Sequence, residues 1–290
     1  MKIDSNLVRK LIYSQFPEWS SLPISTVSRS GWDNRTFRLG AELSVRMPSA
    51  ESYASQVHKE KKWLPYLRER LSVSIPEVLA SGKPGHGYPW PWSVRRWIDG
   101  EDVESESGID TFELAESVAQ FLDELHKVDS SVGPSPGSHN YFRGANLSEY
   151  DRDTQTYIEL LDGNICPKAA LSIWSQGLNA RWISNPVWVH GDLEASNILV
   201  SGGSLAAVID FGNCAVGDPA CDLVMAWTYF DGNARENFRS NLNLDNDTWV
   251  RARAWALWKA LFRMSESLEH LDAEFYSAKN LVDKIVSSPF

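Results

Sequence analysis

Hydrophobic and polar positions follow two different patterns along the chain. Up to about residue 98, short apolar runs bounded by Gly, Pro, Asn and Ser predict strands. These predicted strands are 24–28, 35–39, 43–47, 78–80 and 92–98. Helical spacing of apolar residues appears at 2–16 and 53–70, where Pro65 is expected to kink the helix or to start a new turn. The N-terminal third is therefore predicted to be rich in β-structure.

The rest of the chain has mostly helical spacing. Asp99 and Gly100 end the strand pattern, and an acidic run continues to Glu106, so we place a boundary here, between an N-lobe of residues 1–98 and a C-lobe of residues 99–290. An amphipathic helix follows, with one face made of Phe112, Ala115, Val118, Leu122 and Leu125. Mainly helical stretches are predicted at 148–183 and 247–284, with a strand–loop–strand stretch at 187–210 between them. The order resembles neither a βαβ repeat nor a sandwich and predicts an α+β fold, with a small β-rich N-lobe and a larger, mainly helical C-lobe.

Composition narrows the class of protein. In the 290 residues, 28 Lys and Arg stand against 38 Asp and Glu, a net charge of −10, so no basic field is available to bind nucleic acid. This balance is compatible with a cationic ligand, although many acidic proteins bind nothing positive. The N-terminus has no apolar signal segment and no window is apolar enough to span a bilayer, so we expect a cytoplasmic chain with no membrane partner. The three cysteines have no repeated spacing, which does not favour a disulfide framework or a zinc site.

Candidate chemistry is concentrated in residues 190–210. A short apolar strand leads to His190 and Asp192, and Asn197 follows before a second apolar strand; the turn 201–204 then leads into a third strand that ends on Asp210. This order gathers Asp192, Asn197 and Asp210 at the ends of neighbouring strands. Asn197 and Asp210 are oxygen ligands of the kind that Mg²⁺ prefers. The metal-free carboxylate of Asp192 can orient a hydroxyl and accept its proton, which completes the groups needed to move a phosphoryl group from a nucleotide to an alcohol.

These motifs resemble those of a known family. His190-Gly-Asp192-Leu-x-x-x-Asn197, with Ile-Asp210-Phe-Gly, is similar to the catalytic loop and metal-binding motif of the aminoglycoside phosphotransferase family, within the protein-kinase-like superfamily. Gly-Asp-Pro at 217–219, followed by Asp222 and Leu223, extends the resemblance, which covers most of the chain. The resemblance implies a bilobal protein-kinase-like fold and transfer of the γ-phosphoryl group of ATP or GTP, with Mg²⁺, to a hydroxyl of a small molecule. The leading implied acceptor is an aminoglycoside-type antibiotic, which would be cationic.

The resemblance also implies roles for the C-lobe residues. Asp192 would be the catalytic base that orients the acceptor hydroxyl, and Asn197 and Asp210 would hold magnesium. His190 is expected to hydrogen-bond within the loop, and Asp222 to brace it. In this family the acceptor site is formed by the catalytic loop and C-lobe helices and is often lined with carboxylates. The candidates here are Glu194, Asp222, Asp231 and Glu266.

The N-lobe would then supply the nucleotide site. Ser30 and Gly31 lie in the turn where the family's phosphate-covering loop is expected, although this turn has one glycine and not G-x-G-x-x-G. Arg46 stands in place of the usual lysine of the third strand; arginine keeps the charge and can grip phosphate oxygens with two donors. Glu60, on the following helix, is the expected ion-pair partner of Arg46, with Glu51 as a rival.

The stretch 95–100 aligns with the family's hinge between the lobes. In that position the main chain around Arg96 and Ile98 would present hydrogen-bonding groups to the purine of the nucleotide. The choice between ATP and GTP and the oligomeric state do not follow from these residues.

Three other readings stay open. The acceptor can be a macrolide, choline, homoserine or a methylthiosugar, because the motifs report phosphoryl transfer and not the acceptor. The atypical phosphate loop and Arg46 also fit a nucleotide-binding module without transfer activity, against which the intact Asp192, Asn197 and Asp210 argue. A metal-dependent hydrolase is disfavoured because His190 is the one histidine of that stretch, and such sites usually use several imidazoles.

Overall fold

A computed structural model describes residues 2–27 and 33–288. Its internal contacts divide the chain into two units: residues up to 101 together with 206–212 form unit 1, and residues 102–205 with 213 onwards form unit 2. Unit 1 is built on a sheet and unit 2 is mainly helical, so the predicted α+β class is confirmed. The division into 1–98 and 99–290 stays a proposal, and it does not include the return of 206–212 to unit 1. Ser30 and Gly31 lie outside the described residues.

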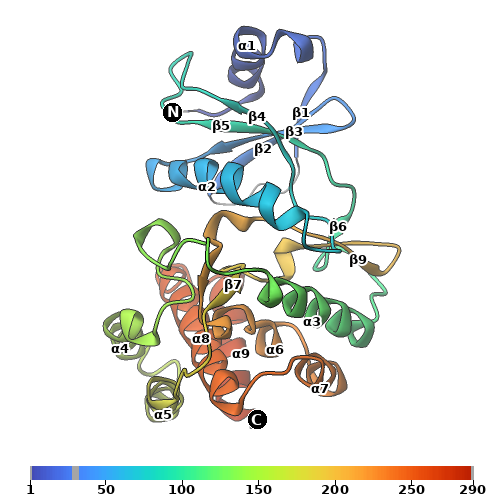
Figure 1. Ribbon diagram of the computed structural model, residues 1–290. Coiled ribbons are helices and arrows are strands. Elements are labelled where there is room, and N and C mark those ends of the chain that lie inside the picture. The colour runs from blue at the N-terminus through green and yellow to red at the C-terminus, as the bar shows by residue number, and fades with distance from the viewer. Residues whose placement is uncertain (1, 28–32, 289–290) are drawn as a thin grey trace. The chain divides into compact units, whose positions relative to one another are not determined.

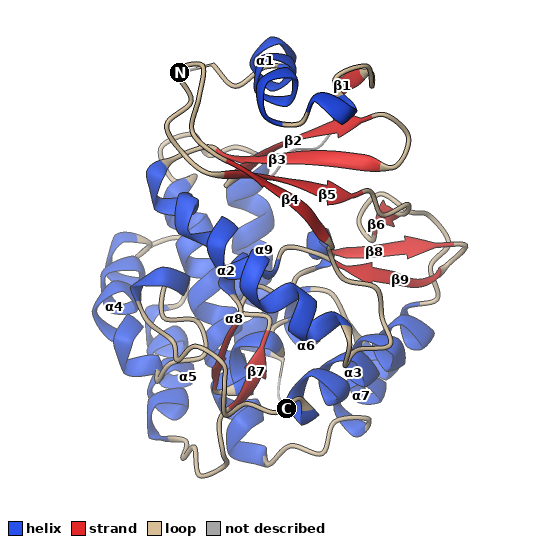
Figure 2. Ribbon diagram, turned by 45° about the horizontal axis from the view of Figure 1, so that its top comes forward, coloured by secondary structure: helices blue, strands red, loops and turns tan. Residues whose placement is uncertain are grey.

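Unit 1 contains a five-stranded antiparallel sheet with the strand order β1-β2-β3-β5-β4. Its strands are β1 (Ile24–Thr26), β2 (Asn34–Leu39), β3 (Leu43–Pro48), β4 (Val78–Gly82) and β5 (Trp92–Arg96). Its helices are α1 (Ser5–Gln15) and α2 (Glu51–Arg68), and Pro65 lies inside α2. The two helices cover opposite faces of the sheet (Figure 1), and strands β2, β3, β5 and β4 lie side by side in Figure 2.

Alternation along the strands gives the sheet two chemically different faces. Val45 of β3 and Val94 of β5 belong to an apolar core that includes the buried residues of α1. The alternate residues Arg46 and Arg95 project to the other face, where both pair with Glu60 of α2. The sheet face that packs against α1 therefore forms the apolar core of unit 1. The face towards α2 holds charged side chains in place.

Unit 2 is mainly helical, and its central element is α8 (Asn246–Glu266). The other helices are α3 (Thr111–Lys127), α4 (Asp151–Leu160), α5 (Pro167–Asn179), α6 (Met225–Thr228), α7 (Gly232–Ser240) and α9 (Ala273–Ser287). Helices α5 and α9 pack against α8, whose residues Trp249, Trp255 and Trp258 are buried. No helix among the described residues is both long and apolar enough to cross a membrane.

Short strands hold the loop that contains Asp192. Strand β7 (Val187–Val189) pairs antiparallel with β10 (Ala215–Gly217) and leads directly into this loop. The remaining strands are β6 (Glu101–Asp102), β8 (Ile198–Ser201) and β9 (Ser204–Val208). The chain passes from one unit to the other within β6, within β9 and within the 3₁₀ turn Phe211–Asn213.

Candidate active site

In unit 1, Arg46 lies between two carboxylates. Its Nη2 atom is 2.5 Å from Oδ1 of Asp210, and its Nη1 atom is 4.0 Å from Oε1 of Glu60. Asp210 belongs to unit 1 because a parallel bridge joins Ala207 to Ser74, just ahead of it. Burial lowers the pKa of Arg46, but the charges of Asp210 and Glu60 outweigh this and raise it above its ordinary value. Arg46 is therefore a permanent cation beside Asp210.

Glu60 has a second and closer partner. Arg95 donates to it with two nitrogens, from Nη2 to Oε2 at 2.5 Å and from Nη1 to Oε1 at 3.2 Å. This two-pronged geometry is the strong form of an Arg–carboxylate pair, and the Glu60 side chain is only 1% exposed. Because Arg95 binds Glu60 so closely, Arg46 makes its shortest contact with Asp210.

Helix α2 also holds the backbone that follows Asp210. The Nζ atom of Lys59 donates to the carbonyl oxygen of Gly212 at 2.8 Å. A Cβ atom at Gly212 would lie 2.7 Å from Cδ of Gln56, so α2 and this segment approach closely. The approach favours glycine at 212.

The residues expected at the purine site lie at and after the end of β5. Arg96 is exposed; its Nε atom donates to Glu77 at 2.7 Å, and its backbone N–H donates to the Glu77 carbonyl at 3.0 Å. Ile98 follows the strand and is half-buried. The purine-binding role of both residues stays a proposal.

In unit 2, hydrogen bonds fix the loop around Asp192. The two side-chain oxygens of Asp222 accept the backbone N–H groups of His190 and Gly191, at 2.6 and 2.8 Å. The Nδ1 atom of His190 accepts a hydrogen bond from the backbone N–H of Asp192 at 3.2 Å. The Nδ2 atom of Asn197 donates to the carbonyl oxygen of Asp192 at 2.9 Å. Both expectations for the loop are met: His190 hydrogen-bonds within it, and Asp222 braces it.

The same bonds leave specific atoms for ligands. Asn197 uses its amide nitrogen on Asp192, so its amide oxygen is turned away from that bond and can serve as a metal ligand. Asp210 offers a carboxylate whose side chain is 31% exposed. An amide oxygen and a carboxylate are both ligand types that Mg²⁺ accepts, and the use of these two residues in one metal site stays a proposal. Among the described residues, no three His, Cys, Asp or Glu side chains gather in a cluster typical of a richer metal site.

Two cations of α8 reach the loop. Lys259 and Arg263 are four residues apart and therefore share one face of the helix. The Nζ atom of Lys259 lies 2.6 Å from Oδ1 of Asp192 and also pairs with Oε1 of Glu194, whose Oε2 pairs with Arg263. Burial raises the pKa of Asp192, but Lys259 and Arg143 outweigh it and hold that pKa well below its usual range. Asp192 is therefore a carboxylate in a positive environment.

Arg143 approaches the loop from a strained segment. Its guanidinium lies 4.5 Å from the ring centre of Trp258, and a Cβ atom at Gly191 would be 3.2 Å from Cβ of Arg143. Tyr141 and Phe142, just before it, both have left-handed backbone angles, with φ of 53° and 59°. Left-handed angles are costly for non-glycine residues, and such strain is concentrated at functional sites.

The acceptor candidates lie in different places. Glu194 is in the charged cluster with Lys259, and Asp222 is fully buried behind the loop, where burial raises its pKa. Asp231 is 70% exposed before α7 and pairs with Lys284 at 2.7 Å, and Glu266 is exposed at the end of α8. The structure thus brings Glu194 and Asp222 to the loop of Asp192, whereas Asp231 pairs with Lys284 and Glu266 lies at the end of α8.

Sequence reasoning did not identify Lys259 or Arg263 as site residues, and it did not identify Arg95 as the close partner of Glu60. The available signal was a charge inside an apolar pattern: Lys259 lies in the helical run Trp255–Leu261, and Arg95 lies in a buried strand. Such a charge indicates a partner, because an unpaired buried charge is very costly. It does not say which residue that partner is.

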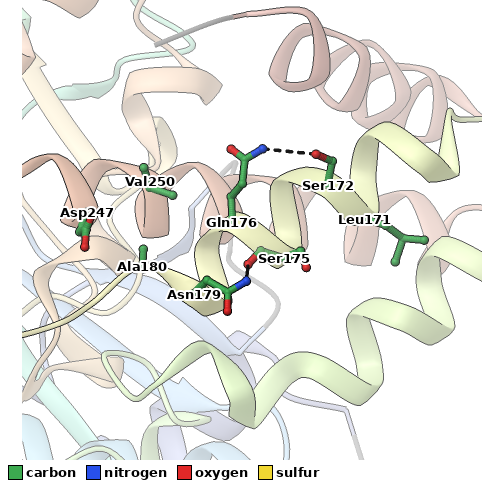
Figure 3. A pocket seen from close by; sticks show the side chains of 8 residues that line it. All are labelled: Leu171, Ser172, Ser175, Gln176, Asn179, Ala180, Asp247 and Val250. Carbon is green, nitrogen blue, oxygen red and sulfur yellow. Dashed lines mark hydrogen bonds between the residues drawn. The ribbon is translucent and has the colours of Figure 1, made fainter.

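A groove of about 700 Å³ lies away from these residues, over α5 and the first turns of α8. Figure 3 shows its polar side chains satisfied along α5: Gln176 donates to Oγ of Ser172 and Asn179 donates to the carbonyl of Ser175. No side chain of the loop that contains Asp192 lines this groove, so we do not assign it to the site.

Solved structures share the fold of this chain. A variant of aminoglycoside 2'-phosphotransferase-IIIa in its GDP complex matches with a TM-score of 0.76 and 19% identity, over 97% of each chain. An aminoglycoside phosphotransferase bound to GDP and kanamycin matches with a TM-score of 0.73 and 19% identity, over 98% of this chain and 99% of that one. Macrolide 2'-phosphotransferase MphH from Brachybacterium faecium matches with a TM-score of 0.65 and 18% identity, over 96% and 97%. The protein-kinase-like fold is confirmed.

Sequence comparison adds the family. No curated protein sequence matches the chain. The model of a family described as the phosphotransferase enzyme family matches residues 25–255, which include Arg46, the loop of Asp192 and Asp210. The motif resemblance, the fold and this match over most of the chain agree. The chain therefore belongs to the phosphotransferase enzyme family.

Proposed function

We propose that this phosphotransferase moves the γ-phosphoryl group of ATP or GTP, with Mg²⁺, to a hydroxyl of a small molecule of the aminoglycoside type. The observation that supports this best is the setting of Asp192. Lys259 holds its Oδ1 atom at 2.6 Å, whereas its Oδ2 atom accepts no hydrogen bond from the described residues. A fixed, ionised carboxylate with one available oxygen is suited to accept a hydrogen bond from an alcohol.

Each residue has one role in the proposed reaction. Asp192 orients the acceptor hydroxyl and accepts its proton as the new oxygen–phosphorus bond forms. The bond between the γ-phosphorus and the β–γ bridging oxygen breaks, and the nucleoside diphosphate leaves. Asn197 and Asp210 would hold Mg²⁺, which neutralises phosphate charge when bound. Asp210 is oriented for this by Arg46.

The nucleotide site is proposed in unit 1. Arg46 is a permanent cation with a planar fork of donors, which suits phosphate oxygens. Arg96 and Ile98 are proposed to present main-chain groups to the purine, and Ser30 and Gly31 to cover the phosphates. Similar structures contain GDP in some cases and ADP in others, so both ATP and GTP are proposed.

Aminoglycosides are the first proposed acceptors because similar structures contain kanamycin and gentamicin. Glu194 would be the acceptor-site carboxylate nearest to the base, with Asp222 behind the loop. Macrolides are the second candidate. Macrolide 2'-phosphotransferases have the same fold, and Lys259 and Arg263 neutralise the loop carboxylates, leaving less negative charge to attract a polycation.

The test is mass spectrometry of candidate acceptors after incubation with the protein, Mg²⁺ and ATP or GTP. The panel contains aminoglycosides, macrolides, choline, homoserine and a methylthiosugar. We expect one class to gain a phosphoryl group with the unchanged chain and none to gain it with Asp192→Asn. Nucleotide binding without product from any acceptor would instead support the non-catalytic nucleotide-binding module.

A further inference from the structure

Lys259 is a lysine in an unusual place. It lies on α8 between Trp258 and Leu261, both buried, and its own side chain is only 12% exposed. Taking an ammonium group out of water is costly unless opposite charges surround it. Two carboxylates do so here, Asp192 and Glu194 of the catalytic loop.

The contacts form a row of alternating charges within unit 2. Arg263 pairs with one oxygen of Glu194, Lys259 pairs with the other, and Lys259 then reaches Asp192. Glu194 is 13% exposed and Asp192 is 31% exposed, so Asp192 is the more accessible carboxylate of the row. Glu194 and Arg263 therefore fix the ammonium group that fixes Asp192.

We infer that Lys259 is a positioning residue for phosphoryl transfer: through Oδ1 it sets the rotation of the Asp192 carboxylate, so that Oδ2 meets the acceptor hydroxyl. This inference rests on the proposed function. Stability alone is a poor reason to keep such an arrangement, because buried ion pairs are often replaced by apolar side chains without loss. Orientation is a better reason, since a displacement of about 1 Å at a reacting group can cost about 10²-fold in rate.

The test separates kcat from KM. We expect Lys259→Met to lower kcat by about 10²-fold while KM for nucleotide and acceptor changes by less than about threefold. Lys259→Arg should recover part of the loss, because a guanidinium can still donate to Asp192. Lys279→Met is the matched control: Lys279 lies on α9 and pairs with Asp283 one turn away, so both constants should stay unchanged.

Two outcomes would overturn the inference. One is a Lys259→Met variant whose kcat stays within about twofold of the unchanged chain. The other is a raised acceptor KM with kcat retained, which would make Lys259 a binding residue.

Failure of the proposed function would look different, because the unchanged chain would then phosphorylate no acceptor. In that case a double-mutant cycle in urea tests the pair without turnover. Lys259→Met should shift the unfolding midpoint more in the chain with Asp192 than in Asp192→Asn. Equal shifts in both backgrounds would overturn the pairing itself.

Discussion

Asp222 holds two consecutive backbone N–H groups, those of His190 and Gly191, with its two side-chain oxygens. The carboxylate is completely buried, and so is His190. The residues that follow Gly-Asp-Pro in the sequence motif thus secure the turn from which Asp192 projects. The motif therefore has a structural role: its Asp222 fixes the backbone of the loop that contains Asp192.

Asp222→Ala should destabilise the chain by about 2–5 kcal/mol, because it leaves two buried N–H groups without an acceptor. Urea unfolding measures this change, and turnover should fall with it because the loop is no longer fixed. Asp231→Ala is the control, since that carboxylate is 70% exposed and its removal should cost less than about 1 kcal/mol. Similar losses in the two variants would contradict the bracing role.

Gly191 and Gly203 form a natural pair for comparison, with φ of 80° and 82°. An alanine at 203 would meet nothing within 4 Å, so it should cost only the left-handed strain of about 1–2 kcal/mol. An alanine at 191 would add a Cβ atom 2.4 Å from the carbonyl oxygen of Asn213. We expect Gly191→Ala to be clearly less stable than Gly203→Ala in urea and to lose turnover, and equal stability would contradict the close approach.

Asp192→Asn keeps the shape of the side chain but removes the charge that accepts a proton. Turnover should fall by about 10²–10⁴-fold, the usual contribution of a general base. Circular dichroism should show an intact fold.

Asp210→Ala should also abolish turnover, and raising the Mg²⁺ concentration should not restore it. Near-normal turnover in either variant would contradict the roles proposed for these two carboxylates.

The side chain of His126 is expected to make the folded chain less stable in acid. It lies in the last turn of α3, where burial lowers its pKa to about 4 although nearby Asp123 raises it. Its buried Nε2 atom has no hydrogen-bond partner among the described residues. The unfolded chain therefore binds a proton at His126 below about pH 6.5, whereas the folded chain does so only near pH 4. The neutral His126 side chain therefore contributes to the free energy of unfolding in full above about pH 6.5. This contribution is lost as the pH falls towards 4, and the loss is at most about 3 kcal/mol.

Urea unfolding at pH 7 and at pH 5 measures this loss. His126→Gln should reduce the difference between the two pH values. The same substitution at His58, an exposed histidine of α2, should leave the difference unchanged. An identical pH dependence in all three chains would rule out His126 as its source.

Features that depend on residues close together along the chain could be predicted from the sequence. Strands and helices follow from apolar spacing, and Asp192, Asn197 and Asp210 follow from a motif whose members lie within about twenty residues of one another. Lys259 was not predictable, because it meets Asp192 across 67 positions of the chain. A charge in an apolar helix indicates that a partner exists, but only the packing of α8 against the loop selects it.

The partner of Glu60 shows the same limit. Arg46 and Arg95 lie on neighbouring strands and project to the same face, because Arg46 is paired with Ser93 and Ser44 with Arg95 in the sheet register. Either could reach Glu60, and the strand spacing alone does not rank them. The tertiary structure gives the close contact to Arg95 and turns Arg46 towards Asp210.

Because residues 206–212 belong to unit 1, this unit cannot be completed when its first 101 residues have been synthesised. The first 101 residues emerge with the strands of the sheet, yet the segment that bridges Ser74 and brings Asp210 to Arg46 follows more than a hundred residues later. Until then, Arg46 has emerged without its closest anionic partner. Unit 1 is therefore completed only after the first part of unit 2, residues 102–205, has been synthesised. Any fragment that ends before residue 212 contains an incomplete unit 1.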